Sequence, residues 1–355
     1  MAKTPWDVII VGQGLAGTTL GLHLQAAGQR VLLLDPARPV SASRIAAGLM
    51  TPITGQRLTV SWRVDEFLPY ARTFYCGVEQ QTGRSFFDER MALRLFTSAA
   101  EHEVLQKRLR DPQFRAHLVE GPFEQFLPAA VADSSGGGFA MKAAQLDVAA
   151  FLDAAGGLLT SEPVTLDWAK DVSFGDAAVS VAGHSARYVI SCEGHAAAQN
   201  PHFAFVPFNA AKGDILTLRL EAPLPAHSLH RGIWLAPGAD SQVFRLGASY
   251  DRASLDEVPN PEARAVLEEK LKAFFDVPYT VVGHSAAVRP IIRESKAVIG
   301  FHPVHRRLGF FNGLGSKGSL HGPWFAKQFS TCLVTGSAVP AAFDVQQYAD
   351  RMAGV

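Results

Sequence analysis

The sequence predicts an α/β protein with a parallel sheet built from both ends of the chain and a mixed or antiparallel sheet between them. The opening segment reads as strand, glycine turn, helix, strand and acid, with apolar runs at 8–11 and 31–34. A second strand, glycine turn and helix occupy 308–333, so the chain begins and ends in one structural unit. Between these ends, 215–220 alternates apolar and polar side chains, which is typical of a half-exposed sheet.

Composition limits the class of protein. The 355 residues exceed the usual size of one domain, and 48% hydrophobic residues can fill a sizeable core. The 33 basic and 33 acidic residues balance, and there is no basic tail, so the charge distribution counts against a nucleic-acid partner. Cys76, Cys192 and Cys332 lack metal-ligand spacing, so we expect free thiols and no metal site. With no room for a signal peptide and no apolar run near ~18 residues, we expect a cytoplasmic protein without a membrane anchor.

The remaining elements follow from periodicity and turn residues. Apolar residues recur at three- and four-residue spacing in the predicted helices, and the short buried or alternating runs are predicted strands. A serine- and glycine-rich stretch at 133–138 indicates a surface loop or a domain crossing. The predicted helices lie at 62–82, 99–110, 146–155, 261–275 and 319–333, and the predicted strands at 188–192, 215–220, 243–248 and 308–312.

The opening glycine turn has the spacing of a dinucleotide site. Gly12 permits a tight turn, Gly14 lets the backbone approach a pyrophosphate, and Gly17 lets the helix pack closely on the sheet. The helix start, with Leu15 and Ala16, offers free N–H groups to phosphates. Asp35 ends the second strand, where a carboxylate can accept both ribose hydroxyls. The turn alone leaves NAD and FAD open.

Over nearly its whole length the chain resembles the D-amino acid oxidase superfamily of FAD enzymes. The resemblance rests on the opening turn, Ser43–Leu49, Lys212-Gly213-Asp214, Arg289-Pro290 and the terminal Gly-Leu-Gly-Ser-Lys-Gly. Within the superfamily the chain is similar to glycine oxidase. It is also similar, through 246–250, 288–289 and 313–318, to the oxidase half of the bifunctional enzyme that finishes 5-methylaminomethyl-2-thiouridine in tRNA. We expect no counterpart of the methyltransferase half of that enzyme.

The resemblance implies a Rossmann-like FAD-binding domain that is discontinuous in sequence, with an inserted substrate domain. We place the FAD-binding domain at 1–75, 145–200 and 285–355, and the substrate domain at 76–144 and 201–284. FAD is expected to be non-covalent, because Arg289 occupies the position where sarcosine oxidases attach flavin through cysteine and Cys332 lies inside the last predicted helix. Glu193 is larger than the small residue usual at its position. The expected cofactor-binding residues are Gly12, Gly14, Leu15, Ala16, Gly17, Asp35, Pro36, Ser43, Arg44, Ala46, Ala47, Gly48, Leu49, Val164, Cys192, Glu193, Gly194, Arg289, Gly313, Gly315, Ser316, Lys317 and Gly318.

The candidate catalytic residues are Arg289, Arg245 and Lys317. Arg289 lies in an apolar run before a proline, and its planar fork suits a substrate carboxylate; the alternative is an internal salt bridge. Arg245 matches the lysine that promotes oxygen reaction in sarcosine oxidases, or it is a solvated strand arginine. Lys317 adds a cation to N–H groups that stabilise a reduced ring at 315–318, or it points to solvent. Trp234, where glycine oxidase has a tyrosine, is expected to bind substrate.

The sequence therefore predicts an FAD-dependent amine oxidoreductase that acts on an amino acid or N-substituted glycine. Hydride is expected to pass from the α-carbon to flavin N5 and to give an imine that water hydrolyses, with oxygen or another electron acceptor closing the cycle. Two alternatives stay open. One is oxidation of a carboxymethylaminomethyl-modified tRNA base, and the other is a flavin-binding protein without catalytic activity.

Overall fold

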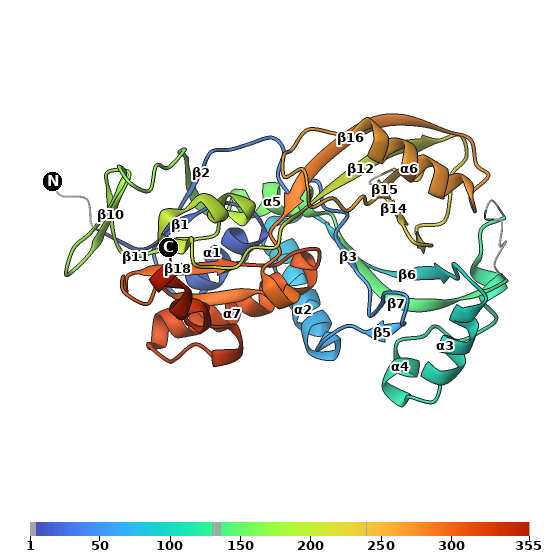
Figure 1. Cartoon of the computed structure of the whole chain (residues 1–355), viewed down its shortest axis with the longest axis horizontal. Coiled ribbons are helices and arrows are strands. Elements are labelled where there is room, and N and C mark those ends of the chain that lie inside the picture. Colours follow the sequence, from blue (N-terminus) through green and yellow to red (C-terminus); the bar gives the residue numbers. More distant parts are fainter. Residues whose placement is uncertain (1–4, 130, 132–135, 239, 355) are drawn as a thin grey trace.

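The computed structural model describes residues 5–129, 131, 136–238 and 240–354. Two large sheets lie side by side along the longest axis of the molecule, and both chain ends lie with the first sheet (Figure 1). The α/β prediction, with parallel and antiparallel sheets, is confirmed.

The first sheet is assembled from both ends of the chain. Its central pairs are parallel, and the strands 6–11, 31–35 and 308–312 are largely buried apolar runs, as in a sheet covered on both faces. The hairpin β9–β10 and strand β17 add antiparallel edges. The strand order is β17 (Val298–Phe301), β18 (Leu308–Asn312), β11 (His184–Ser191), β1 (Trp6–Val11), β2 (Val31–Asp35) and β8 (Thr160–Pro163), with β10 (Val179–Val181) on β11 and β9 (Val172–Phe174) on β10.

Four helices pack against this sheet and against one another. They are α1 (Leu15–Ala26), α2 (Val64–Thr82), α5 (Val148–Gly156) and α7 (Gly318–Thr335). Phe67, Tyr75, Phe151 and Phe325 are fully buried in the core between them. The Tyr75 hydroxyl donates to the Ser319 carbonyl oxygen at 2.9 Å, so it fastens α2 to the first turn of α7.

The second sheet is mostly antiparallel, with one parallel pair between β13 and β6. Its strand order is β16 (Tyr279–Arg289), β12 (Ala211–Leu220), β15 (Val243–Gly247), β14 (Trp234–Pro237), β13 (Ser228–His230), β6 (Phe87–Leu95), β7 (Gly138–Leu146) and β3 (Leu49–Met50). Helices α3 (Ala100–Arg108), α4 (Pro112–Ala116) and α6 (Pro261–Lys272) flank it (Figure 1). A small hairpin joins β4 (Ile53–Thr54) to β5 (Thr59–Val60).

Short 3-10 helices complete the described chain. They are η1 (Phe123–Phe126), η2 (Gly194–Gln199), η3 (Pro201–Phe203), η4 (Arg293–Ser295), η5 (Ala341–Phe343) and η6 (Val345–Gly354).

The predicted elements are present, with shifted ends. β12 begins at Ala211 rather than 215, because residues 211–214 pair with the end of β16. Of the predicted loop at 133–138, residues 133–135 lie outside the described part of the chain, and Gly138 already opens β7. The domain boundaries stay a prediction. No helix of the described ranges is long and apolar enough to cross a membrane, and within those ranges no cluster of histidine, cysteine or carboxylate side chains could hold a metal ion.

Candidate active site

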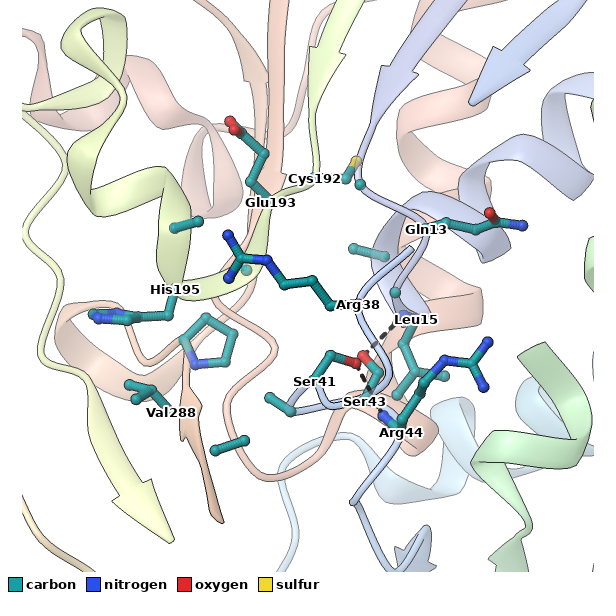
Figure 2. A pocket seen from close by; sticks show the side chains of 18 of the residues that line it. Gln13, Leu15, Arg38, Ser41, Ser43, Arg44, Cys192, Glu193, His195 and Val288 are labelled. Carbon is teal, nitrogen blue, oxygen red and sulfur yellow. Dashed lines mark hydrogen bonds between the residues drawn. The ribbon is translucent and has the colours of Figure 1, made fainter. Parts of the chain in front are cut away.

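A cavity of about 1460 Å³ is lined by residues of both sheets. From the first sheet and its loops come the glycine turn, Asp35 and Gly194. From the second come Ile215, Trp234 and Arg289. Figure 2 shows the Arg38 side chain extending from the 38–44 segment toward the segment that carries Glu193 and His195.

The first glycine turn brings the start of α1 to the cavity. Gly12 has φ 105°, and a Cβ there would lie 2.5 Å from the Cys192 carbonyl oxygen. At Gly17 a Cβ would lie 1.8 Å from the Gly12 carbonyl oxygen, so only glycine lets the helix start this close to the turn. The tight turn predicted at Gly12 and the close packing of the helix predicted at Gly17 are both present.

Asp35 and Ser43 face the same end of the site. Asp35 accepts hydrogen bonds from the backbone N–H groups of Gln13, at 2.7 Å, and Ala37, at 2.8 Å, one on each carboxylate oxygen. Each oxygen keeps acceptor capacity for a further hydroxyl group. The Ser43 hydroxyl accepts from the Leu15 N–H at 3.1 Å and so holds its loop against the start of α1 (Figure 2).

Glu193 fits its position because its carboxylate is held by three donors. It accepts from the Trp168 indole at 2.9 Å, the Ser191 hydroxyl at 2.7 Å and the Asn200 side chain at 3.1 Å. These bonds join the 193–194 turn to the 164–168 segment, and both line the cavity. Glu193 therefore braces one wall.

Two arginines of the 38–44 segment line the cavity. Arg44 lines the cavity edge and pairs with Asp153 at 2.9 Å. Arg38 also lines the cavity, and Figure 2 shows its side chain extending between Ser41 and Glu193.

The segment 45–48 passes along the cavity with its carbonyl groups held by the second sheet. The Arg245 guanidinium donates to the carbonyls of Ile45 and Ala46, the latter at 2.8 Å. The Gln145 amide donates to the Ala47 carbonyl at 3.0 Å, and the Leu146 N–H donates to the Gly48 carbonyl at 3.0 Å. Arg245 is partly buried, and removal from water lowers its pKa. With its guanidinium bound to two carbonyls, it is not the solvated strand arginine of the alternative prediction.

The second glycine turn offers fewer free N–H groups than its spacing suggests. Gly315 N–H donates to the Pro290 carbonyl at 3.3 Å, and Lys317 N–H donates to the Leu314 carbonyl at 3.1 Å. Ser316 and Gly318 N–H have no acceptor among the described residues. The predicted four donors are therefore narrowed to these two.

Lys317 turns away from solvent. Its ammonium group donates to the Ser61 hydroxyl at 3.1 Å, and burial lowers its pKa. The solvent-facing alternative is wrong.

Arg289 ends β16 and lines the cavity. Its guanidinium donates to the carbonyls of Lys212, at 3.1 Å, and Ser249, at 3.2 Å, and lies 5.7 Å from the Tyr250 ring centre. Burial lowers its pKa, with smaller opposing effects of Tyr250 and Asp214. It forms no ion pair with any carboxylate in the described ranges, so the internal salt bridge is absent there.

The cavity brings most predicted site residues together. Gly17, Arg245, Gly313 and Lys317 do not line it. Gly17 packs against the first glycine turn and Gly313 lies in the second. Arg245 hydrogen-bonds to Ile45 and Ala46, which line the cavity, whereas Lys317 hydrogen-bonds to Ser61, which does not. Sequence reasoning missed Arg38, Trp168, His195 and Glu257, which line the cavity from loops without a recognisable spacing.

The fold and the cavity define a class of protein. A parallel sheet with a glycine turn, a helix N-terminus and a strand-end acid at its edge is built to hold a dinucleotide. The cavity continues to an arginine and a tryptophan of a second sheet, so a second molecule can bind beside the dinucleotide. The arrangement is that of an enzyme with a bound nucleotide cofactor.

Comparison with known proteins names the family. Residues 7–331 match the family model described as FAD dependent oxidoreductase (DAO). The chain belongs to this family, and it is an FAD-dependent oxidoreductase.

Solved structures share the fold. Glycine oxidase from Bacillus cereus ATCC 14579 superposes with a TM-score of 0.80 at 15% identity, over 94% of this chain and 96% of that one. Glycine oxidase from Geobacillus kaustophilus gives 0.78 at 20% identity, over 96% and 98%. Iminodiacetate oxidase (IdaA) from Chelativorans sp. BNC1 gives 0.74 at 20% identity, over 95% and 98%.

Proposed function

We propose that this enzyme oxidises the C–N bond of a small primary or secondary amine that carries a carboxylate, such as an amino acid or an N-substituted glycine. The observation that carries the proposal is Arg289. It is a partly buried cation in the cavity wall, it has no carboxylate partner in the described chain, and its fork suits a carboxylate ligand. The names of the structural neighbours, which are oxidases of glycine and iminodiacetate, agree with this substrate class.

The residues present fit FAD along the whole cavity. Asp35 has oxygens available for ribose hydroxyls, and Val164 lies beside it, with its N–H donating to the Asp35 carbonyl at 3.0 Å. The start of α1, Ser43 and Arg38 suit the phosphates. In the second glycine turn, between β18 and α7, the Ser316 and Gly318 N–H groups suit an electron-rich ring edge. When bound, FAD supplies the hydride acceptor.

The second sheet positions the amine. We propose that Arg289 holds the substrate carboxylate and that Trp234, packed on Gly247, forms an apolar wall beside it. With the carboxylate held, the α-carbon has one orientation in the cavity, and such orientation contributes much of an enzyme's rate enhancement. Oxygen or another molecule then accepts the electrons.

Non-covalent attachment of FAD is also proposed. Cys192 is the cysteine among the described residues that lines the cavity, and burial holds the pKa of its thiol well above the usual value. A protonated thiol is a poor nucleophile. Acid precipitation is expected to release the yellow chromophore, and a chromophore retained in the pellet would contradict non-covalent binding.

Anaerobic reduction of the flavin tests the substrate class. N-methylglycine and other carboxylated amines are expected to bleach the flavin absorbance of the wild type, and Arg289→Ala is expected to bleach far more slowly. Bleaching by amines without a carboxylate at the same rate would sink the role of Arg289. FAD binding without bleaching by any amine supports the non-catalytic alternative, and salt-sensitive tRNA binding supports the modified-base alternative.

A further inference from the structure

The segment 45–48 has an unusual arrangement of hydrogen bonds. All four of its carbonyl groups are bound, by Arg245, Gln145 and the Leu146 N–H. Its first two N–H groups, of Ile45 and Ala46, donate to the carbonyls of Ser41 and Ser43. The N–H groups of Ala47 and Gly48 have no acceptor among the described residues, although both residues line the cavity.

Two side chains of the second sheet create this arrangement. Arg245 comes from β15, and Gln145 comes from β7. Gln145 uses its second N–H to bind the Pro237 carbonyl at the end of β14, at 2.9 Å, so it is fixed from both sides. In a trans peptide the N–H points opposite to the C=O, so the bonds to the Ala46 and Ala47 carbonyls direct the Ala47 and Gly48 N–H groups away from Arg245 and Gln145.

Arg245 is unlike an ordinary strand arginine. It is partly buried, it does not line the cavity, and it forms no ion pair within the part of the chain that the structure describes; Asp147 is the acid whose charge reaches it. Its charge therefore acts on the two carbonyl groups it binds. A cation on a peptide carbonyl polarises the peptide and strengthens the donors along the same segment.

We propose that Arg245, supported by Gln145, is a positioning residue that aims and polarises the Ala47 and Gly48 N–H groups at the flavin ring. In this role Arg245 stays behind the cavity wall and raises the electron affinity of the ring through the backbone. This differs from a cation placed on the ring itself. The inference rests on the placement of FAD in this cavity and is independent of the amine substrate.

Sulfite binding and the flavin midpoint potential provide readouts that need no substrate. Sulfite adds to the flavin and leaves negative charge on the ring, so its affinity reports how well the protein stabilises that charge. With FAD saturating, we expect Arg245→Met to raise the sulfite dissociation constant about tenfold, the change expected when a hydrogen bond to a charged group is weakened. The midpoint potential is expected to fall in parallel.

Arg245→Lys and Arg219→Met complete the experiment. Lysine keeps the charge but lacks the fork that binds two carbonyls, so about a threefold loss is expected. Arg219 lies in the neighbouring strand β12 with an exposed side chain, and Arg219→Met is expected to match the wild type. If Arg245→Met does not fold, Arg245→Lys decides the question.

The outcomes separate this inference from the proposed function. Unchanged sulfite affinity and potential in a folded, FAD-saturated Arg245→Met or Arg245→Lys variant would overturn the inference and leave the amine chemistry standing. Failure of the wild type to bind FAD would instead remove the placement on which both rest.

Discussion

Arg289 and Arg245 lie two strands apart in the same sheet and share most of their local properties. Both are partly buried, both donate to two backbone carbonyls, and neither has an ion-pair partner in the described ranges. Arg289 lines the cavity and Arg245 does not. The comparison teaches that burial and charge alone do not define a ligand-binding group, because a buried cation can also hold the wall that other groups face.

A related distinction separates two carboxylates that both line the cavity at the edge of the first sheet. Asp35 lines the cavity and keeps acceptor capacity, whereas Glu193 has its oxygens bound to Trp168, Ser191 and Asn200. We expect changes to groups that face the cavity to alter affinity more than stability. Changes to groups that brace the wall should do the reverse.

The largest effect is expected at Arg289. Arg289→Met removes the partner of a substrate carboxylate, and loss of one member of a buried charge pair costs about 2–5 kcal/mol. We therefore expect kcat/KM for a carboxylated amine to fall on the order of 10²- to 10³-fold, with FAD binding retained. Anaerobic stopped-flow reduction measures this, and Arg219→Met is the control from the same sheet. An Arg245→Met defect that is equally specific for carboxylated amines would break the comparison.

Asp35→Asn is expected to weaken FAD binding. It removes a charged acceptor, and hydrogen bonds to charged groups contribute about 1.5–3 kcal/mol, so the FAD dissociation constant should rise roughly 10- to 100-fold. Fluorescence titration measures the change. Asp7→Asn is a matched control. The Asp7 carboxylate also accepts a hydrogen bond from a backbone N–H, that of Arg30 at 2.8 Å, but Asp7 does not line the cavity. Equal losses in both variants would show that Asp35 acts only through the fold.

Glu193→Gln should sharpen the contrast from the opposite side. The amide group places a donor against donors, and an unsatisfied buried group costs about 1–3 kcal/mol. We expect the apoprotein Tm to fall by about 3–6 °C, while FAD affinity changes no more than about threefold. Thermal unfolding and FAD titration of the same sample provide both numbers. A large loss of affinity at an unchanged Tm would make Glu193 a ligand of the cofactor.

The smallest effect concerns acid stability of α7, which carries the second glycine turn. Burial, together with Lys317, lowers the pKa of His321 to about 3 from 6.5. Between pH 6.5 and pH 3, His321 is protonated in the unfolded chain but not in the folded one. Its contribution to the free energy of unfolding is therefore complete above pH 6.5 and is lost as pH falls toward 3.

His321→Phe tests this because it keeps the aromatic contacts with Phe67 and Trp62. Between pH 7 and pH 4.5 we expect the Tm of both proteins to fall. The fall is expected to be about 3 °C smaller in the variant than in the wild type. His23 and His230, whose pKa values are lowered to about 4, titrate in the same direction in both proteins. Identical pH profiles would exclude a contribution of His321.

The features that the sequence predicted well depend on short stretches of chain. The first glycine turn could be recognised from the sequence because Gly12, Gly17 and Asp35 lie within a single strand–helix–strand unit, where their spacing is fixed. Arg289 stood out because it interrupts an apolar run. Roles that depend on distant partners could not be predicted. The Arg245 partners lie about 200 residues away, the Ser61 partner of Lys317 256 residues away, and the Trp168 partner of Glu193 on another segment.

The two glycine turns also fix when the cofactor site can form. A Cβ at Gly318 would lie 2.9 Å from the Leu15 side chain, so the first turns of α1 and α7 are in close contact although they are about 300 residues apart. During synthesis, the first glycine turn is made early, but the FAD site is complete only after nearly all later residues have been added. FAD binding therefore reports that folding is complete. A chain truncated before 313 is expected to bind no FAD, and so to lack the yellow colour, even where its first sheet has formed.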